Sequence, residues 1–339
     1  MNSLTETPPW AWVVFGVVVL GALFVDLFIG RAARERTPKE SVLWVGVWVG
    51  LALLFNVGVY YWKGARPAYE FFSAYLVEQS LSVDNLFVFL LLFRYFQVPA
   101  QRQHRVLFWG ILGAIAMRAV MIIAGVELLQ KFTWFEYVFG GFLILTGLKL
   151  FFSSGGEHDP SQSWPSRLLK RCLPFCSEYE GERFFIRRPD PKSATGKLVT
   201  LATPLFLVLL LVEFTDLLFA LDSIPACLGL SRDPFVVYTS NIFAVLCLRA
   251  LYFLLARSLF KLRFLNPALA LLLVGIGAKM LVPNDPETGE SPISILLMLG
   301  GVVGILGLAI AASLLFPGKP APEPPAAVAP EPAAPSQQT

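Results

Sequence analysis

Residues 199–225 read VTLATPLFLVLLLVEFTDLLFALDSIP, an apolar run that three acidic side chains interrupt. The run is long enough for a membrane helix, since a helix needs about 20 mostly apolar residues to cross a bilayer. Glu213, Asp216 and Asp222 therefore lie where hydrocarbon excludes charge, at a cost of about 2.5–3.5 kcal/mol each on insertion scales. Such residues predict a polar site inside a helical membrane protein.

The composition of the whole chain agrees with this interpretation. Of the 339 residues, 56% are hydrophobic and 15% are charged, whereas soluble domains carry about 25% charged residues. This excludes a soluble enzyme, a disordered protein and a nucleic-acid binder, and a net charge of +3 is too small to indicate a polyanionic partner. Four cysteines lack the spacing of a disulfide framework or a zinc site, so we interpret them as reduced thiols. They are Cys172, Cys176, Cys227 and Cys247.

Nine apolar stretches predict an all-α integral membrane protein with about nine transmembrane helices. They are residues 9–29, 41–62, 71–93, 105–129, 132–152, 199–225, 234–256, 264–282 and 293–316. The first two form an N-terminal segment, 1–62, and the last span, 293–316, stands alone. The Pro- and Ala-rich tail, 317–339, is expected to be disordered.

Basic residues predict the orientation of the spans. Arginine and lysine crowd the connections 30–40, 94–105, 153–198 and 257–263 and are scarce in the intervening ones. Because positively charged loops stay in the cytoplasm, we expect the amino terminus outside, the carboxyl terminus in the cytoplasm and an odd number of spans. We interpret the basic cytoplasmic loop, 153–198, as a solvated linker, with an amphipathic helix on anionic lipid as the alternative.

Charged anchors at matched spacing indicate an internal repeat. Arg118 precedes Lys149 by almost the same number of positions as Arg249 precedes Lys279. Repeat 1 (71–152) and repeat 2 (199–282) would each hold three helices, so the two copies must enter the membrane from opposite sides. This predicts an inverted 3+3 helix repeat with a binding site near the midplane, where the copies meet.

The first helix of each repeat carries a pair of carboxylates six positions apart, followed by a polar residue. The two sets are Glu78, Asp84 and Asn85 in one repeat, and Asp216, Asp222 and Ser223 in the other. An alignment that pairs Asp84 with Asp216 stays open. Six positions turn a straight helix by about 120°, so one ion could not meet both carboxylates. We therefore expect local unwinding, near the serines of 71–93 and before Pro225.

The embedded residues favour a hard cation. Lys149 and Lys279 lie near helix ends and can reach the interface, which leaves five acids against Arg118 and Arg249. Carboxylate, amide and hydroxyl oxygens suit Mn²⁺, Mg²⁺ or Ca²⁺, whereas zinc and copper prefer His and Cys. The membrane segments hold no nucleophile, histidine and acid set, so an enzyme is not expected.

Two runs resemble the signatures of the TerC family of integral membrane proteins. The first is YLVEQSLSVDNLFVF, residues 75–89, and the second extends from Thr203 to Ala226. Residues 233–235, 239–244 and 248–253 continue the resemblance, while Cys227 and Cys247 depart from it. The resemblance implies a nine-helix protein, with tellurium resistance as the historical label and manganese efflux as the activity of bacterial members.

We therefore expect a secondary transporter that exports Mn²⁺, coupled to protons, across a bacterial cell membrane. The expected metal ligands are Glu78, Asp84, Asn85, Asp216, Asp222 and Ser223, with Glu213 relaying a proton and Arg118 and Arg249 supporting the acids. The expected partners are the divalent ion, as cargo, and the lipid bilayer; no tightly bound cofactor is expected, and the sequence indicates no oligomeric state. The alternatives are a scaffold for membrane-protein insertion or maturation and a channel or carrier for Ca²⁺ or Mg²⁺.

Overall fold

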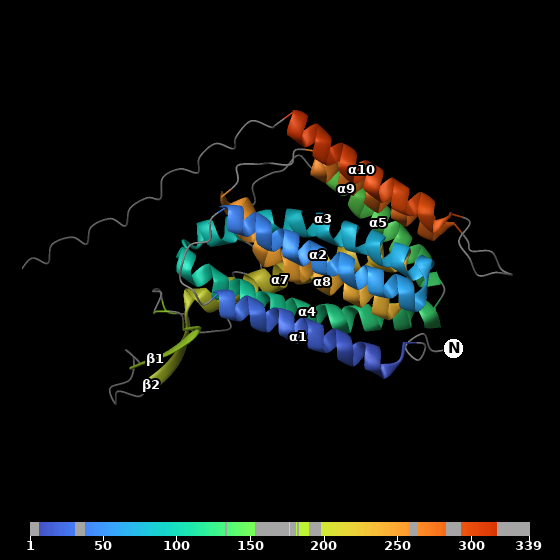
Figure 1. The fold of residues 1–339 in the computed structure, drawn as a ribbon. Helices are drawn as coiled ribbons and strands as arrows, with labels where there is room; N and C mark the ends of the chain where they lie inside the picture. Colours follow the sequence, from blue (N-terminus) through green and yellow to red (C-terminus); the bar gives the residue numbers. More distant parts are fainter. Residues whose placement is uncertain are drawn as a thin grey trace, which may run out of the picture.

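The computed structural model (Figure 1) describes residues 7–30, 38–132, 134–152, 176, 181, 183–189, 198–257, 264–282 and 293–316. Within these ranges the side chains of residues 26–30, 38, 84, 87, 91, 94, 189, 198, 257 and 314 are not described. The predicted tail, 317–339, and most of the basic loop, 153–198, lie outside the described residues.

Helices make up most of the described chain and lie side by side as a bundle (Figure 1). They are α1 (Pro9–Gly30), α2 (Pro38–Lys63), α3 (Ala65–Tyr95), α4 (Ala100–Lys131), α5 (Trp134–Phe152), α7 (Pro204–Leu230), α8 (Pro234–Arg257), α9 (Leu265–Leu281) and α10 (Ile295–Leu315). Helices α1, α2, α7 and α8 begin with proline. Proline suits the first helical position because its φ is preset and its missing N–H would have no partner there.

A short hairpin stands where the sequence predicted the start of a helix. β1 (Phe185–Pro189) and β2 (Leu198–Ala202) pair antiparallel, and α7 begins only at Pro204. The prediction of helix from residue 199 is therefore wrong. Two β-branched residues, at 199 and 200, favour a strand. The proline at 204 also keeps Thr203 in an extended conformation, with φ −85° and ψ 162°.

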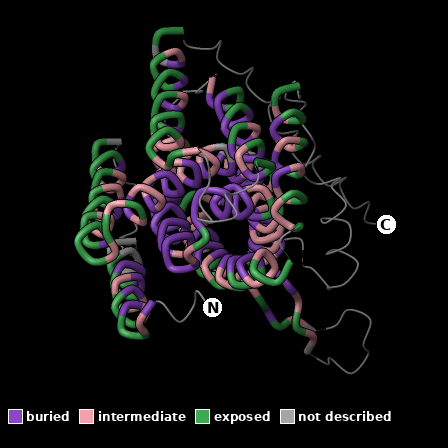
Figure 2. The backbone as a smooth tube through the Cα atoms, turned by 90° about the vertical axis from the view of Figure 1, so that its right-hand side faces the viewer, coloured by how far each residue is buried: buried purple, intermediate pink, exposed green. Residues whose placement is uncertain are grey.

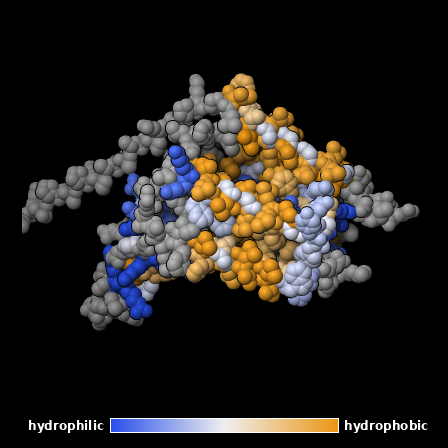
Figure 3. Space-filling view, viewed as in Figure 1, coloured by the Kyte–Doolittle hydropathy of each residue, from blue (hydrophilic) through white to orange (hydrophobic). Residues whose placement is uncertain are grey.

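Six described helices are long and apolar enough to cross a membrane: α2, α4, α5, α7, α8 and α10. Helices α1 and α9 hold shorter apolar stretches, and α3 carries Glu78, Gln79, Asp84 and Asn85 in its middle. Apolar side chains cover much of the visible helix surface, and hydrophilic ones gather beside the hairpin (Figure 3). The chain is thus a helical membrane protein, as its composition predicted.

Helix α8 is the most deeply buried of the six candidate spans, and buried residues gather at the centre of the bundle (Figure 2). Helices α1 to α4 contact α8, and aromatic rings fill much of that contact. Phe243 of α8 lies with its ring centroid 4.9 Å from Phe55 of α2 and 5.9 Å from Phe15 of α1. Offset aromatic pairs at such distances stabilise beyond the area they bury, which anchors the N-terminal segment to the core.

The connections between helices alternate between two ends of the bundle. The turn end holds residues 63–66, 131–136, 231–233 and 279–282, and the hairpin end holds the β-strands with residues 96–105 and 252–257. Contacts join distant segments at each end. Lys63 pairs with Asp233 at the turn end, and Tyr252 donates a hydrogen bond to Gln103, 2.8 Å between oxygens, at the hairpin end.

Helices α3 and α7 are both continuous, so the predicted local unwinding is wrong. Pro225 lies inside α7 and is buried, and the helix continues past it to residue 230. Hydroxyl groups do not open the helices either. Ser80 and Thr215 donate to the carbonyls of Leu76 and Leu211, at 2.7 and 2.6 Å. Each of these hydroxyls finds its partner four residues back, a bond that an intact helix accommodates.

Candidate functional site

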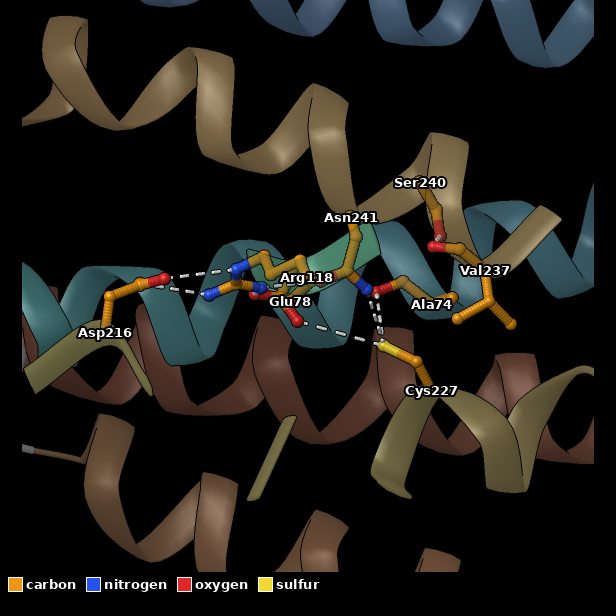
Figure 4. A network of polar contacts seen from close by, with 8 residues as sticks. All are labelled: Ala74, Glu78, Arg118, Asp216, Cys227, Val237, Ser240 and Asn241. Carbon is orange, nitrogen blue, oxygen red and sulfur yellow. Dashed lines mark hydrogen bonds and ion pairs between the residues drawn. The ribbon is translucent and has the colours of Figure 1, made fainter. Parts of the chain in front are cut away.

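Four helices meet at one buried arginine, Arg118 of α4, whose side chain is 0% exposed. Its Nη2 lies 3.2 Å from Asp216 Oδ1 of α7, and its Nε lies 3.4 Å from Asp216 Oδ2. Nη1 donates to Glu78 Oε1 of α3 and to Asn241 Oδ1 of α8, the latter at 2.5 Å. The guanidinium thus joins two carboxylates that lie far apart in the sequence (Figure 4).

Close packing of α4 against α7 brings Arg118 to Asp216. The two helices run parallel in a constant register. A Cβ at Gly110 would lie 3.2 Å from Val212, and one at Gly125 would lie 2.8 Å from Leu228. Without side chains at these α4 positions, the side chains of α7 approach the α4 backbone. The glycines therefore set the distance at which arginine and carboxylate can meet.

Asn241 and Cys227 complete the network, and neither was predicted from the sequence as a site residue. The Asn241 amide donates to Cys227 Sγ at 3.4 Å, and the thiol lies 3.8 Å from Glu78 Oε2. Asn241 ends a polar run of three residues in the largely apolar α8, and that run was the feature of the sequence that could have indicated it. Cys227 gave no signal, since buried cysteine is common as a small apolar residue.

Glu213 and Asp222 lie on α7 but outside this network. The Glu213 carboxylate packs against α4, where a Cβ added to Gly113 would lie 2.0 Å from Oε1. Asp222 accepts a hydrogen bond from Thr146 of α5 at 3.3 Å. The direction of Asp222 follows from helix geometry, because six positions turn it about 120° away from Asp216.

Three further predicted residues are also buried. Asn85 is 3% exposed, Ser223 1% and Arg249 3%. The hydroxyl of Ser223 has no hydrogen-bond partner among the described residues, and the same holds for Ser82 of α3. Asp84 lies on α3, and its side chain is outside the described part of the chain.

Two of the four predicted carboxylate ligands are thus brought together, Glu78 and Asp216. Among the described residues, no three His, Cys, Asp or Glu side chains gather closely enough to hold a metal ion. Two carboxylates, an amide oxygen and nearby unpaired hydroxyls are oxygen donors of the kind that hard divalent cations prefer. The six-residue metal site stays a prediction.

A polar cluster ties the α7–α8 turn, residues 231–233, to three other helices. Its contacts are Lys63 of α2 with Asp233, Glu136 of α5 with Arg232, and Glu70 of α3 with Ser231. Glu70 precedes the apolar run 71–93, and burial raises the pKa of its carboxyl, while Ser231 and Arg66 act in the opposite direction. The cluster holds the turn end of α7 in place.

Two cavities lie beside α7, one toward each end of the bundle. At the turn end, a cavity of about 530 Å³ is lined by α3, α7, α9 and α10 and includes Glu70 and Lys279. On the hairpin side of Asp216, this carboxylate and otherwise nonpolar residues line a cavity of about 10 Å³, at the lower limit for one water molecule. Packed apolar side chains therefore close this side of the network.

Comparison with known proteins identifies the family. The family model described as "Integral membrane protein TerC family" matches residues 63–319. The chain belongs to the TerC family. It is 45% identical over 312 residues, 91% of this chain and 92% of the relative, to "Uncharacterized membrane protein STKORF319" of Myxococcus xanthus.

Several enterobacterial relatives carry the name "Putative membrane-bound redox modulator Alx". The Escherichia coli K12 protein is 43% identical over 312 residues, 89% of this chain and 93% of the relative. The Salmonella typhi protein is 41% identical over 316 residues, 90% of this chain and 94% of the relative. No solved structure matches this TerC protein.

Proposed function

We propose that this TerC protein is a secondary transporter that exports a divalent metal cation, Mn²⁺ above others, in exchange for protons. The observation that carries the proposal is the meeting of Glu78 and Asp216 at one buried site, on helices that are otherwise largely apolar. Buried acids cost free energy in a membrane and mark ion pathways in transporters. Carboxylates that bind a metal also bind protons, so the two cations compete for the same oxygens.

An inverted repeat with nine spans would place this site between the two copies. Three helix pairings support that architecture. The repeat would make α7, α8 and α9 the equivalents of α3, α4 and α5, so the contact of α3 with α8 would be equivalent to that of α7 with α4. The third contact would join two equivalent helices, α5 and α9. Glycines at the α5–α9 contact strengthen the comparison. A Cβ at Gly147 would lie 2.8 Å from the Ala270 carbonyl, and one at Gly277 would lie 2.6 Å from the Gly140 carbonyl. Gly140 and Gly147 are seven positions apart in α5, as Ala270 and Gly277 are in α9, so the repeat would relate one contact to the other.

The proposed orientation places the hairpin end in the cytoplasm and the turn end outside, in a bacterial cell membrane. The helix ends that adjoin the basic connections lie at the hairpin end, and positively charged loops favour the cytoplasmic side. In this orientation the cavity of about 530 Å³ faces outward. Exported ions would leave through it.

Six residues would bind the ion in turn or together during transport. They are Glu78, Asp84, Asn85, Asp216, Asp222 and Ser223. Oxygen ligands favour Mn²⁺, Mg²⁺ and Ca²⁺, and the family resemblance favours Mn²⁺ among them. The unpaired hydroxyl of Ser223 supports its place in the set, because a buried hydroxyl without a partner is costly unless a ligand satisfies it.

Flux of ⁵⁴Mn²⁺ into everted membrane vesicles tests this function. The wild-type chain should show saturable uptake that an imposed proton gradient drives. Glu78→Gln and Asp216→Asn should each abolish it, because each removes a buried charge that attracts the cation. Glu127→Gln, which affects an exposed pair with Lys131 on α4, is the matched control and should leave uptake intact.

Several outcomes would overturn the proposal. Flux that persists in both carboxylate variants would remove the acidic site from the pathway. Non-saturable flux without a gradient would indicate a channel, and uptake of ⁴⁵Ca²⁺ in place of ⁵⁴Mn²⁺ would indicate another cargo. Insertion defects in other membrane proteins of a deletion strain, with no change in flux, would indicate a scaffold.

A further inference from the structure

The guanidinium of Arg118 occupies the place between the two carboxylates that the proposed function gives to the transported ion. It bonds Glu78 and Asp216 together with the Asn241 amide oxygen. We infer that Arg118 is an exchangeable counter-ion: the divalent cation displaces its guanidinium from Glu78 and Asp216, and the guanidinium moves to Glu213. This inference rests on the proposed function.

Charge balance supports an exchange rather than joint occupancy. Two carboxylates carry two negative charges, and one guanidinium neutralises one of them. A divalent cation would neutralise both, and a guanidinium held beside it would repel it at short range in a medium of low dielectric constant. The site therefore holds either the arginine or the metal, and the arginine balances the acids after the metal has left.

Glu213 is placed to receive the displaced guanidinium. It lies three positions before Asp216 on α7 and so on the same helix face, within about one helical turn of 5.4 Å. Its carboxylate packs against α4 at Gly113, five positions before Arg118. Side chains of a helix lean toward its amino terminus, which for α4 is the direction of Gly113. The exchange therefore requires Arg118 to change rotamer toward Gly113 and Glu213.

An alternative is that Arg118 is a fixed structural bridge between α3, α4, α7 and α8. Both interpretations predict that removing the arginine harms transport, so flux alone cannot separate them. They differ in metal binding. A fixed bridge has no reason to compete with the ion, whereas an exchangeable one competes directly, and its removal strengthens binding.

Mn²⁺ binding to the purified full-length protein in detergent separates them, measured as loss of the free-ion electron paramagnetic resonance signal. Arg118→Gln should bind Mn²⁺ at least about tenfold more tightly than the wild type while losing transport. Arg232→Gln is the matched control, since Arg232 pairs with Glu136 at the turn end, and it should bind as the wild type does. Equal affinity of Arg118→Gln and wild type would overturn the exchange.

Glu213 supplies a second test, whose first arm uses the wild-type background and does not depend on the folding of an Arg118 variant. Glu213→Gln should weaken Mn²⁺ binding about threefold or more in the wild-type background, because the displaced arginine loses its receiving carboxylate. In the Arg118→Gln background the same change should have no effect. Gly113→Ala should act like Glu213→Gln, since its Cβ would take the place of the Glu213 carboxylate.

The failure modes of the two proposals differ. If Glu213→Gln leaves binding unchanged in a wild-type chain that transports Mn²⁺, the exchange is wrong and the transport proposal stands. The same conclusion follows if Glu213→Gln weakens binding equally in both backgrounds. If the wild-type chain neither binds nor moves Mn²⁺, the proposed function itself is wrong.

Discussion

At the scale of single residues, the protein buries three charged side chains where water cannot hydrate them. Arg118 is fully buried, as is Glu78, and Asp216 is 4% exposed in its side chain. A buried ion pair gains less net free energy than its short contacts suggest, because both partners lose hydration. Breaking such a pair is nevertheless costly, since it leaves a buried charge unbalanced.

This asymmetry predicts the stability of Arg118→Gln. Without metal, the variant should lose about 3–5 kcal/mol of unfolding free energy because two buried carboxylates lose their counter-charge. Added Mn²⁺ should restore much of the loss, since a ligand that binds only the folded state stabilises it by mass action. Thermal unfolding followed by intrinsic tryptophan fluorescence, with and without Mn²⁺, measures both effects.

Arg232→Gln serves as the control for that measurement. Its partner Glu136 is partly exposed, and exposed pairs contribute only about 0–1 kcal/mol. A metal-free Arg118→Gln protein as stable as this control would contradict the prediction. It would mean that the carboxylates are balanced by another group.

At the scale of helices, glycine decides which surfaces approach each other. Helices α5 and α9 lie so close that a Cβ at Gly277 would be 2.6 Å from the Gly140 carbonyl. Two positions before it, Gly275 lies on the same helix with nothing within 4 Å of an added Cβ. Small residues promote association in membranes because apolar burial alone does not hold helices together in lipid.

The two glycines of α9 make a matched pair of substitutions. Gly277→Ala should lower the unfolding free energy by about 1–3 kcal/mol through overpacking. Gly275→Ala should leave it unchanged or raise it by up to about 1 kcal/mol, since alanine favours a helix over glycine. Denaturant titration in a mild detergent gives the comparison, and equal effects at both positions would show that the α5–α9 contact is looser than described.

At the scale of the whole molecule, the orientation of the bundle would decide the direction of the proposed transport. Tyr61 lies 83% exposed near the turn end of α2, and Arg187 lies exposed on β1 at the hairpin end. The proposed orientation puts the first outside the cell and the second in the cytoplasm. Cys227 and Cys247 are 0% exposed, so these two thiols should not react with a labelling reagent. A signal then comes from the added cysteine.

Labelling intact cells tests this orientation. After Cys172 and Cys176 are replaced by serine, Tyr61→Cys should react with a membrane-impermeant maleimide in intact cells. Arg187→Cys should react only after the membrane is permeabilised. The reverse result would indicate the opposite orientation in the membrane, with the cavity of about 530 Å³ facing the cytoplasm.

The sequence alone determined the class of the molecule and the positions of its helices. Long apolar runs and initial prolines mark where many of the helices lie, and embedded charges marked the helices of the candidate site. The error at residues 199–203 arose because a short apolar run has the hydropathy of a helix, although its β-branched residues and following proline favour a strand.

Only the tertiary structure decided which charges meet. Helix geometry predicted correctly that Asp216 and Asp222 point in different directions, but the unwinding inferred from it does not occur. Asp222 instead meets Thr146 of α5, and Asp216 meets an arginine 98 positions away. Such pairs depend on how closely α4 packs on α7, and that distance is set by glycines whose effect exists only once two helices face each other.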